Sequence, residues 1–195
     1  MRVNLDAAHD AVNAGELVVY PTETVYGLGA NALDTAAIEQ VFDAKHRSRS
    51  KPLSMALPDV ETAQQYVSMT DQELAFASEF LPGPVTLVVE RRDMIPDALT
   101  GGRERVGIRV PDHHIARALA ETGPVTATSA NVSGRPGVRR VREIDERILD
   151  AATVILDGGE TPGGGSTVVD VTAETIYRRG AGVEAVETWL ATSRD

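Results

Sequence analysis

The sequence lacks cysteine, is poor in aromatic residues and contains no long apolar run. The absence of cysteine excludes a disulfide framework, a thiolate metal site and a cysteine nucleophile. No run approaches the ~20 apolar residues of a membrane-spanning helix, so we expect a cytoplasmic protein without a membrane partner. Aromatic residues make up 4% of the chain and the formal net charge is -10. Both values argue against broad binding of nucleic acid, because such binding relies on basic surfaces and stacking aromatics.

Lysine is nearly absent as well. The chain has only Lys45 and Lys51, and both lie in the segment KHRSRSK (45–51) together with Arg47 and Arg49. A charge run of this kind is often only a solvated helix face. In a chain with a net charge of -10, so dense a basic segment also predicts a local site for anions.

Strand-like and helix-like segments alternate along the chain. The predicted strands cover residues 16–21, 52–57, 85–90, 105–111, 124–130, 153–159, 166–171 and 175–180. The predicted helices cover residues 34–45, 59–67, 70–80, 112–122, 142–152 and 183–191, with Asp34, Asp59 and Thr70 placed to cap three of them. No repeat or linker divides the sequence, so we predict one α/β domain over residues 1–195. The strands at 18–20, 85–89 and 125–127 are expected to be buried on both faces, which predicts a mixed sheet with helices on both sides.

The segment GLGANA (27–32) matches the loose glycine pattern of dinucleotide-binding sites, but its context does not fit. The preceding strand ends six residues before Gly27, and the basic segment stands where an acidic ribose ligand is required. We therefore expect no hydride-transfer enzyme and place Gly27 and Gly29 in a turn or bulge where backbone approaches closely. His113 and His114 are adjacent and should not face the same side of a helix, so no metal site is expected there.

Hydroxyl, glycine and arginine residues gather where the predicted strands end. They occur in PTETVYGLG (21–29), RVGIRVP (105–111), TSANVSG (128–134), GGGSTVVD (163–170) and YRRG (177–180). Loops at strand ends form the ligand sites of α/β sheets. Backbone N–H groups, hydroxyls and guanidinium groups bind phosphate and carboxylate. With the basic segment, these loops predict a site for an anionic substrate.

The same segments resemble the YrdC/Sua5 family. The match consists of PTETVYGLG, K-x-R-x-x-x-K-P-L beginning at Lys45, LPGPVT (81–86), R-V-P at Arg109, TSANVSG, and STVVD followed by YRRG, in the family's order. The resemblance implies a twisted α/β fold with a deep concave basic cavity and the activity of L-threonylcarbamoyladenylate synthase. That enzyme joins L-threonine, bicarbonate and ATP, releases pyrophosphate, and supplies the tRNA threonylcarbamoyl-transfer machinery that makes the t6A modification. The longer family members carry an extra C-terminal domain, and at 195 residues we expect the shorter form.

The resemblance also implies roles for individual residues. The catalytic positions are Lys45, Arg47 and Lys51. L-Threonine is expected to contact Thr24, Arg109, Asn131 and Ser166, with Thr167 closing the pocket. ATP is expected to contact Arg47, Lys51, Arg105, Ser129, Arg139 and Arg178, with Mg2+ accompanying the nucleotide and no metal ligands on the protein. Many relatives carry a histidine where this chain has Ala56, so one substrate contact is expected to differ.

Two other interpretations stay open. An RNA-binding module of the same fold is disfavoured by the scarcity of aromatics and by the negative charge. A YciO-like paralogue would share the fold with weak or different activity, and the intact K-x-R-x-x-x-K-P-L and TSAN segments favour the synthase. No general base stands out, because Glu23 qualifies by location only and a structural role at the turn is equally consistent. Catalysis is therefore expected to rest on orientation and charge stabilisation.

Overall fold

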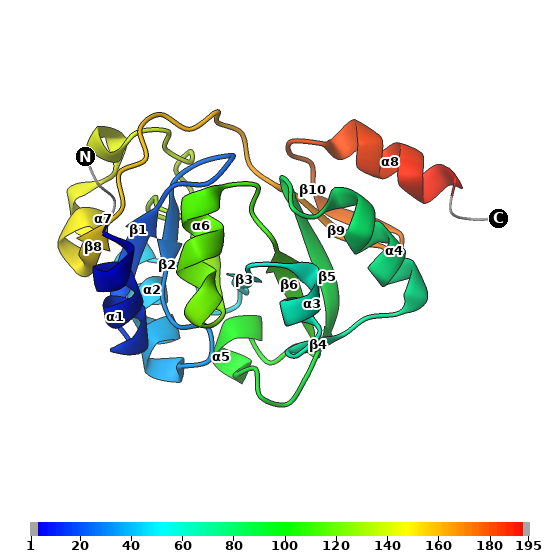
Figure 1. Ribbon diagram of the computed structural model, residues 1–195, viewed down its shortest axis with the longest axis horizontal. Coiled ribbons are helices and arrows are strands. Elements are labelled where there is room, and N and C mark those ends of the chain that lie inside the picture. The colour runs from blue at the N-terminus through cyan, green and yellow to red at the C-terminus, as the bar shows by residue number, and fades with distance from the viewer. Residues whose placement is uncertain (1–3, 193–195) are drawn as a thin grey trace.

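The computed structural model describes residues 4–192, which form an α/β fold (Figure 1). Their helices are α1 (Leu5–Asn13), α2 (Thr35–Lys45), α3 (Val60–Ala63), α4 (Asp71–Phe80), α5 (Asp97–Thr100), α6 (His114–Leu119), α7 (Glu146–Ala151) and α8 (Val183–Thr192), with short 3-10 turns at Ala120–Thr122 and Val141–Glu143. Their strands are β1 (Leu17–Tyr20), β2 (Gly27–Gly29), β3 (Ser54–Ala56), β4 (Val67–Ser68), β5 (Val85–Arg91), β6 (Arg105–Arg109), β7 (Val125–Ser129), β8 (Ala152–Ile155), β9 (Thr167–Asp170) and β10 (Thr175–Arg178). The predicted domain also includes residues 1–3 and 193–195, which lie outside the described residues.

The strands join in one mixed sheet. Its order is β10-β9-β5-β6-β3-β7-β2-β1-β8, with β4 paired to β5. The pairs β1–β8, β3–β6 and β5–β9 are parallel, and the other pairs are antiparallel. Helices α1, α2 and α7 lie at the β1–β8 end, whereas α4 and α8 lie at the β9–β10 end (Figure 1). The predicted mixed α/β sheet is confirmed.

Strand β1 is covered on both faces, whereas the predicted burial of residues 85–89 and 125–127 on both faces is only partial, because Val88 and Ala127 are half-buried. Leu17 and Val19 point into the large apolar core, which includes the buried side chains of α2. Val18 and Tyr20 point the other way, into a second cluster built with α1 and α6. All four side chains are buried, as expected for alternating side chains on a strand packed against helices on each face. Within residues 4–192, no helix is long and apolar enough to cross a bilayer.

The predicted helix caps are present. Asp34 begins α2 and its Oδ1 accepts a hydrogen bond from the Ala36 N–H at 2.8 Å. Asp59 accepts from the Thr62 N–H at 2.6 Å. Thr70 and Glu73 form a reciprocal capping box at the start of α4, which satisfies two N–H groups that a helix terminus otherwise leaves free.

Several segments differ from the sequence prediction, which did not include the short helix α5. Residues 59–67 form helix only over α3, after which Val67 becomes fully buried in β4 and pairs with Arg91 of β5. Helix α1 was not predicted, although Ala8, Ala11 and Val12 have helical spacing and bury one face. Pairing with β5 therefore decided the first segment against local propensity. In α1 the local signals, helical spacing and the Asn4 cap, were present and were overlooked.

Gly27 and Gly29 form the short strand β2 rather than a turn or bulge. Their predicted close approach to other atoms is confirmed. A Cβ at Gly27 would lie 2.8 Å from Cζ of Tyr20, and one at Gly29 would lie 2.5 Å from Cγ1 of Val125. Glycine is required here by packing against these two side chains.

Candidate functional site

A pocket of about 900 Å³ opens on one face of the sheet. Val88 of β5, Gly107 of β6, Ser54 of β3 and Ala127 of β7 are successive register partners across the sheet, and all four line the pocket. Loops at the strand ends supply the remaining walls, including residues 164–166 and 135–137. The sheet is therefore the floor of the site, and the loops singled out in the sequence are its rim.

The middle of this floor is made of small side chains. A Cβ on Gly107 would lie 2.4 Å from Oγ of Ser54 and 2.9 Å from Cγ2 of Thr86. Arg105 and Arg109 stand two residues to either side of Gly107, so they share its face of the strand and also line the pocket. The alternation of arginine and glycine on β6 thus sets charged groups around an open centre.

Arginine dominates the charge of the pocket. Among the residues that the structure describes, seven arginines line it, against Glu104 as the single acidic residue; they are Arg47, Arg103, Arg105, Arg109, Arg135, Arg178 and Arg179. Four of them form ion pairs with acidic side chains. Arg47, Arg103 and Arg178 form none within residues 4–192. The positive charge of these three is available to a ligand.

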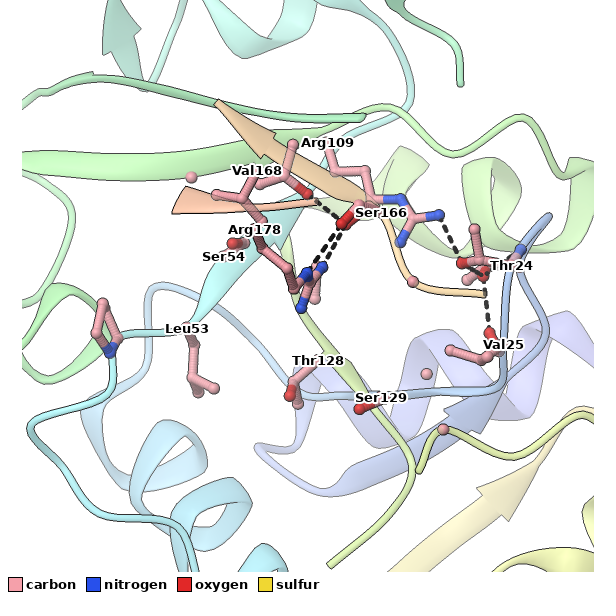
Figure 2. A pocket seen from close by; sticks show the side chains of 18 of the residues that line it. Thr24, Val25, Leu53, Ser54, Arg109, Thr128, Ser129, Ser166, Val168 and Arg178 are labelled. Carbon is pink, nitrogen blue, oxygen red and sulfur yellow. Dashed lines mark hydrogen bonds between the residues drawn. The ribbon is translucent and has the colours of Figure 1, made fainter. Parts of the chain in front are cut away.

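Arg178 is fixed by neutral oxygen atoms. Its Nε donates to the carbonyl of Ser166 at 2.9 Å and its Nη2 donates to Oγ of Ser166 at 2.6 Å (Figure 2). Oγ of Ser166 also lies 2.9 Å from Oγ1 of Thr86. Burial, followed by the charges of Arg109 and Arg47, lowers the pKa of Arg178. Arg109 and Arg47 therefore lie close enough to Arg178 to disfavour its charge, which favours the binding of an anion in the pocket.

Arg109 is held from one side only. Its Nη2 donates to Oγ1 of Thr24 at 2.9 Å and lies 2.8 Å from Oε2 of Glu23. Its Nε is buried and donates no hydrogen bond. In Figure 2 its guanidinium extends between Thr24 and Ser166. A guanidinium that is fixed on one side and lines the pocket suits recognition of a carboxylate.

Arg47 shapes the basic segment and lines the pocket. Helix α2 ends at His46, which adopts left-handed backbone angles with φ of 49°. The Nε of Arg47 donates to the carbonyl of Lys51 at 3.0 Å, and its Nη2 donates to the carbonyl of Pro52 at 2.9 Å. These bonds curl residues 47–52 into a loop. Burial lowers the pKa of Arg47, and no acidic side chain of the described residues pairs with it.

Lys45 does not line the pocket. It is 1% exposed, and its Nζ donates to the carbonyl of Asn131 at 2.6 Å and to the carbonyl of Ser129. Burial, followed by the charge of Arg47, lowers its pKa to about 7. Because the carbonyls belong to the TSAN segment, Lys45 joins the end of α2 to the end of β7. This location fits a positioning role rather than the predicted direct contact with phosphate.

The rest of the basic segment lies outside the pocket lining. Arg49 is exposed and pairs with Asp43 at 2.6 Å and Glu39 at 2.7 Å, and its guanidinium lies over the ring of Phe42. Lys51 is exposed. Within the segment, Lys45 is therefore buried, Arg47 lines the pocket, and Arg49 and Lys51 are exposed.

Arg105 and Arg139, which were predicted to contact the nucleotide, both form ion pairs with carboxylates of the protein. Arg105 lines the pocket but lies 2.7 Å from Glu73 and 2.9 Å from Asp170, both buried. Arg139 lies outside the lining and pairs with Glu160 at 2.7 Å. Neither guanidinium has the free charge of Arg178.

Of the hydroxyl and amide side chains predicted to contact the substrates, some line the pocket and others are buried outside its lining. Ser129, Ser166 and Thr24 line the pocket. Asn131 lies behind the lining, where its amide donates to the carbonyls of Val132 and Arg135 and its Oδ1 is buried without a hydrogen bond. Thr167 is also buried, and its hydroxyl donates to the carbonyl of Ala181.

Sequence reasoning did not single out several pocket residues. Thr86 and Thr128 belong to the named segments LPGPVT and TSANVSG but were given no role of their own, and for Ser54 the alternation of side chains on β3 was the available signal. Tyr177 also lines the pocket, although only its arginine neighbour was assigned a role. Ala56, the departure from the family pattern, is buried in β3.

The two adjacent histidines were expected to face different sides, and this expectation is wrong. The rings of His113 and His114 stack with centroids 5.0 Å apart. His113 has extended backbone angles because it precedes helix α6, so helical spacing does not apply to the pair. Burial, followed by the charge of His114, lowers the pKa of His113. Residues 4–192 contain no group of three His, Cys, Asp or Glu side chains that could hold a metal ion.

Comparison with known proteins agrees with this arrangement. The family model Sua5/YciO/YrdC, described as "Telomere recombination", matches residues 10–180. The threonylcarbamoyl-AMP synthase of Pyrococcus abyssi (strain GE5 / Orsay) is 41% identical over 165 residues, which are 83% of this chain and 48% of that protein. The chain thus spans about half the length of this relative.

Solved structures give the same assignment. P. abyssi Sua5 complexed with L-threonine superposes with a TM-score of 0.90 at 37% identity, over 97% of this chain and 58% of that one. E. coli YciO superposes with a TM-score of 0.83 at 26% identity, over 91% of this chain and 89% of that one. The resemblance inferred from the sequence motifs is confirmed. With the family model matched across residues 10–180 and the fold shared throughout, the chain belongs to the Sua5/YciO/YrdC family.

Proposed function

We propose that this protein is a threonylcarbamoyl-AMP synthase, which forms threonylcarbamoyl-AMP and pyrophosphate from L-threonine, bicarbonate and ATP. One observation carries the proposal: Arg47, Arg109 and Arg178 converge on a single pocket, and two of them have no acidic partner among residues 4–192. A binding site for one small monoanion does not need three guanidinium groups. A carboxylate and a polyphosphate bound together do.

The geometry supports a division of the pocket into two ends. Arg109, braced by Thr24, would bind the carboxylate of threonine, the amino acid with which P. abyssi Sua5 was crystallised. Arg178 and Arg47 would bind the phosphates of ATP, and the hydroxyls of Ser166 and Ser129 lie in the same lining. Guanidinium groups bind both kinds of anion with paired hydrogen bonds.

The reaction needs orientation more than proton transfer. The neutral amine of threonine attacks the carbon of CO2 and its ammonium proton passes to solvent, or it attacks bicarbonate and a C–O bond breaks with loss of water; either route gives a carbamate. A carbamate oxygen then attacks the α-phosphorus in line, the bond between that phosphorus and the bridging oxygen breaks, and pyrophosphate leaves with the electron pair. Charge builds on the phosphoryl oxygens, where fixed guanidinium groups stabilise it. Glu23 is paired with Arg109, so we assign it to positioning that arginine.

Mg2+ would arrive with the nucleotide. Glu104 is the only carboxylate that residues 4–192 contribute to the lining, and Mg2+ often binds through substrate phosphates with few protein ligands. These residues therefore fit a Mg2+–ATP substrate complex better than a metal centre held by the protein. When bound, the ion would neutralise charge on the pyrophosphate. The protein's own contribution is to bind the carboxylate and the phosphates through its arginines.

Several predicted contacts take indirect roles in this proposal. Lys45 would position Ser129 by holding the carbonyls of the TSAN segment. Asn131 would brace the following loop through Arg135. Lys51, which is exposed, stays a predicted phosphate contact that requires the loop of residues 47–52 to close on the nucleotide.

The direct test is incubation with ATP, L-threonine, bicarbonate and Mg2+, followed by detection of pyrophosphate and of the adenylate by mass spectrometry. We expect both products, and neither when threonine is omitted. Pyrophosphate release independent of threonine would indicate a paralogue with another activity, as considered for YciO-like proteins. Transfer of the product to tRNA by the t6A machinery is proposed as the next reaction. RNA binding without any turnover of ATP would contradict the assignment.

A further inference from the structure

Tyr177 is an exposed aromatic side chain in a pocket wall. It is 62% exposed, the highest value among the exposed large apolar side chains of the described residues. The other two, Met94 and Ile155, lie outside the pocket lining, whereas Tyr177 belongs to it. Exposure of a large ring to water is unfavourable, so a ring kept at a pocket edge is well placed to be covered by a ligand.

A bulge in the sheet edge places this ring beside the pocket. Strand β10 pairs with β9 through Ile176 opposite Val169 and Arg178 opposite Val168, and the register shifts between these pairs. Without a shift, Tyr177 and Arg178 would point to opposite faces of the strand. Both line the pocket. Bulges re-aim side chains in this way and often do so beside functional sites.

Tyr177 continues an apolar strip on the pocket floor. Val168 lies opposite Thr86 of β5 as well as Arg178 of β10, and Val88 stands two residues beyond Thr86 on the same face. Val88, Val168 and Tyr177 all line the pocket, on three neighbouring strands. Figure 2 shows Val168 and Thr24 on opposite sides of the Arg178 guanidinium. The apolar strip is therefore at the other end of the pocket from the threonine contacts.

The order of these groups matches the order of groups in the proposed product. Threonylcarbamoyl-AMP runs from a carboxylate, through a phosphate, to a nucleoside. The pocket runs from Arg109 and Thr24, past Arg178, to Val168 and Tyr177. We propose that Tyr177 stacks on the adenine base of the nucleotide, with Val88 and Val168 beneath it. This inference rests on the proposed function for the identity of the ligand.

The stacking should depend on the ring and not on the hydroxyl. No hydrogen bond of the Tyr177 hydroxyl occurs within the described residues, so phenylalanine supplies the same contact surface. Stacking of a base on an aromatic side chain contributes about 1–3 kcal/mol by alanine substitution. The corresponding loss in affinity for ATP is about 5- to 150-fold. A ligand without a base should be unaffected.

Calorimetric titration with ATP and with inorganic tripolyphosphate tests the inference. Four proteins are compared: the wild type, Tyr177→Ala, Tyr177→Phe and Met94→Ala, the last removing an exposed apolar side chain that lies outside the pocket. We expect Tyr177→Ala to lower the affinity for ATP by about 5- to 150-fold. Its affinity for tripolyphosphate should equal that of the wild type. Tyr177→Phe and Met94→Ala should bind both ligands as the wild type does.

A parallel titration with oligo(A) RNA completes the test. Three results for Tyr177→Ala would overturn the inference: unchanged affinity for ATP, equal loss of affinity for ATP and for tripolyphosphate, or loss of affinity for oligo(A) RNA with ATP binding intact. The last result would assign the ring to RNA. The proposed function is judged separately, by threonine-dependent release of pyrophosphate from the wild type. An inactive wild type whose ATP binding still depends on Tyr177 would reject the synthase and keep the stacking contact.

Discussion

Arg105 and Arg178 line the same pocket, but the protein treats their charges in opposite ways. Arg105 lies between the buried carboxylates of Glu73 and Asp170. Arg178 is held by the carbonyl and hydroxyl oxygens of Ser166, and its pKa is lowered by burial and by two neighbouring arginines. The first arrangement is complete without a ligand. The second leaves a positive charge that only an anion from outside can match.

The basic segment repeats this contrast over a few residues. Arg49 has two acidic partners at the surface, whereas Arg47 is bound only by backbone carbonyls and lines the pocket. Lys45 is buried against two further carbonyls. Positive charge alone therefore does not mark a ligand contact in this protein. For the nucleotide phosphates, the arginines to which we assign contacts, Arg47 and Arg178, line the pocket and have no acidic partner among residues 4–192.

The largest effect is expected for Arg178→Met. Removing one preorganised donor to a developing negative charge costs about 10²–10³-fold in rate, so release of pyrophosphate should fall by that factor. The free energy of unfolding should change little, because the lost partners are neutral oxygens of Ser166 that would then face the open pocket. Steady-state release of pyrophosphate and urea unfolding check both parts. A variant with wild-type turnover would remove Arg178 from the phosphate site.

Arg105→Met should instead act on stability. It would leave Glu73 and Asp170 buried without their cation, and breaking such a network costs about 3–5 kcal/mol. We expect the lower end, about 3 kcal/mol, because the Arg105 side chain is 33% exposed to water. Urea unfolding measures this loss. Assays at saturating ATP on the folded fraction should show turnover within about twofold of wild type, and a selective rise in the KM for ATP would contradict the structural role.

Arg109→Met should weaken the binding of threonine. A hydrogen bond to a charged group contributes about 1.5–3 kcal/mol, so the KM for threonine should rise by about 10- to 150-fold with a small change in the KM for ATP. Kinetics with each substrate varied in turn provide the measurement. Thr24→Val, which removes the hydroxyl that braces Arg109, should shift the same constant in the same direction by less. A change confined to ATP would assign Arg109 to the nucleotide.

Lys45 should make stability depend on pH. Burial lowers its pKa from 10.5 to about 7 in the folded protein, so between these values the unfolded chain binds more protons than the folded one. The free energy of unfolding should therefore rise with pH across this window, by at most about 1.4 kcal/mol per pH unit. The slope should disappear in Lys45→Met. Equal slopes in the two proteins, measured by urea unfolding at pH 6.5, 8 and 9.5, would show that Lys45 is not the titrating group.

Arg49→Met should have the smallest effect. Exposed ion pairs contribute about 0–1 kcal/mol, and the Arg49 side chain is 55% exposed. Turnover and both KM values should match those of the wild type. High salt should reduce the small stability difference further. A substantial loss of turnover would place this residue in the site after all.

The sequence predicted the elements of the fold better than their contacts. Local signals such as Asp34 and the Thr70 capping box fixed helix starts. The parallel pairing of β5 with β9 joins residues about eighty positions apart, and no local pattern encodes such a pairing. Val67 shows the same limit, since its place in β4 depends on β5.

For the candidate site, the sequence indicated which segments meet but not which charges are free. PTET, TSAN, GGGS and YRRG do gather around one pocket, as their positions at strand ends predicted. The sequence did not show that Arg105 and Arg139 have acidic partners whereas Arg178 has none among the described residues. Those partners, Glu73, Asp170 and Glu160, are distant in the sequence and come close only in the folded protein. Tyr177 was overlooked for a similar reason, since a register shift in β10 sets its direction.

The central claim is that arginines without acidic partners bind the nucleotide and that paired ones do not. Calorimetric titration of ATP into the wild type, Arg178→Met and Arg139→Met at one fixed salt concentration tests it most directly, because both arginines were predicted from sequence to bind ATP. We expect Arg178→Met to weaken binding by about 10- to 150-fold and Arg139→Met, whose guanidinium already pairs with Glu160, to bind within about twofold of wild type. Equal losses in the two variants, or a larger loss in Arg139→Met, would contradict the claim.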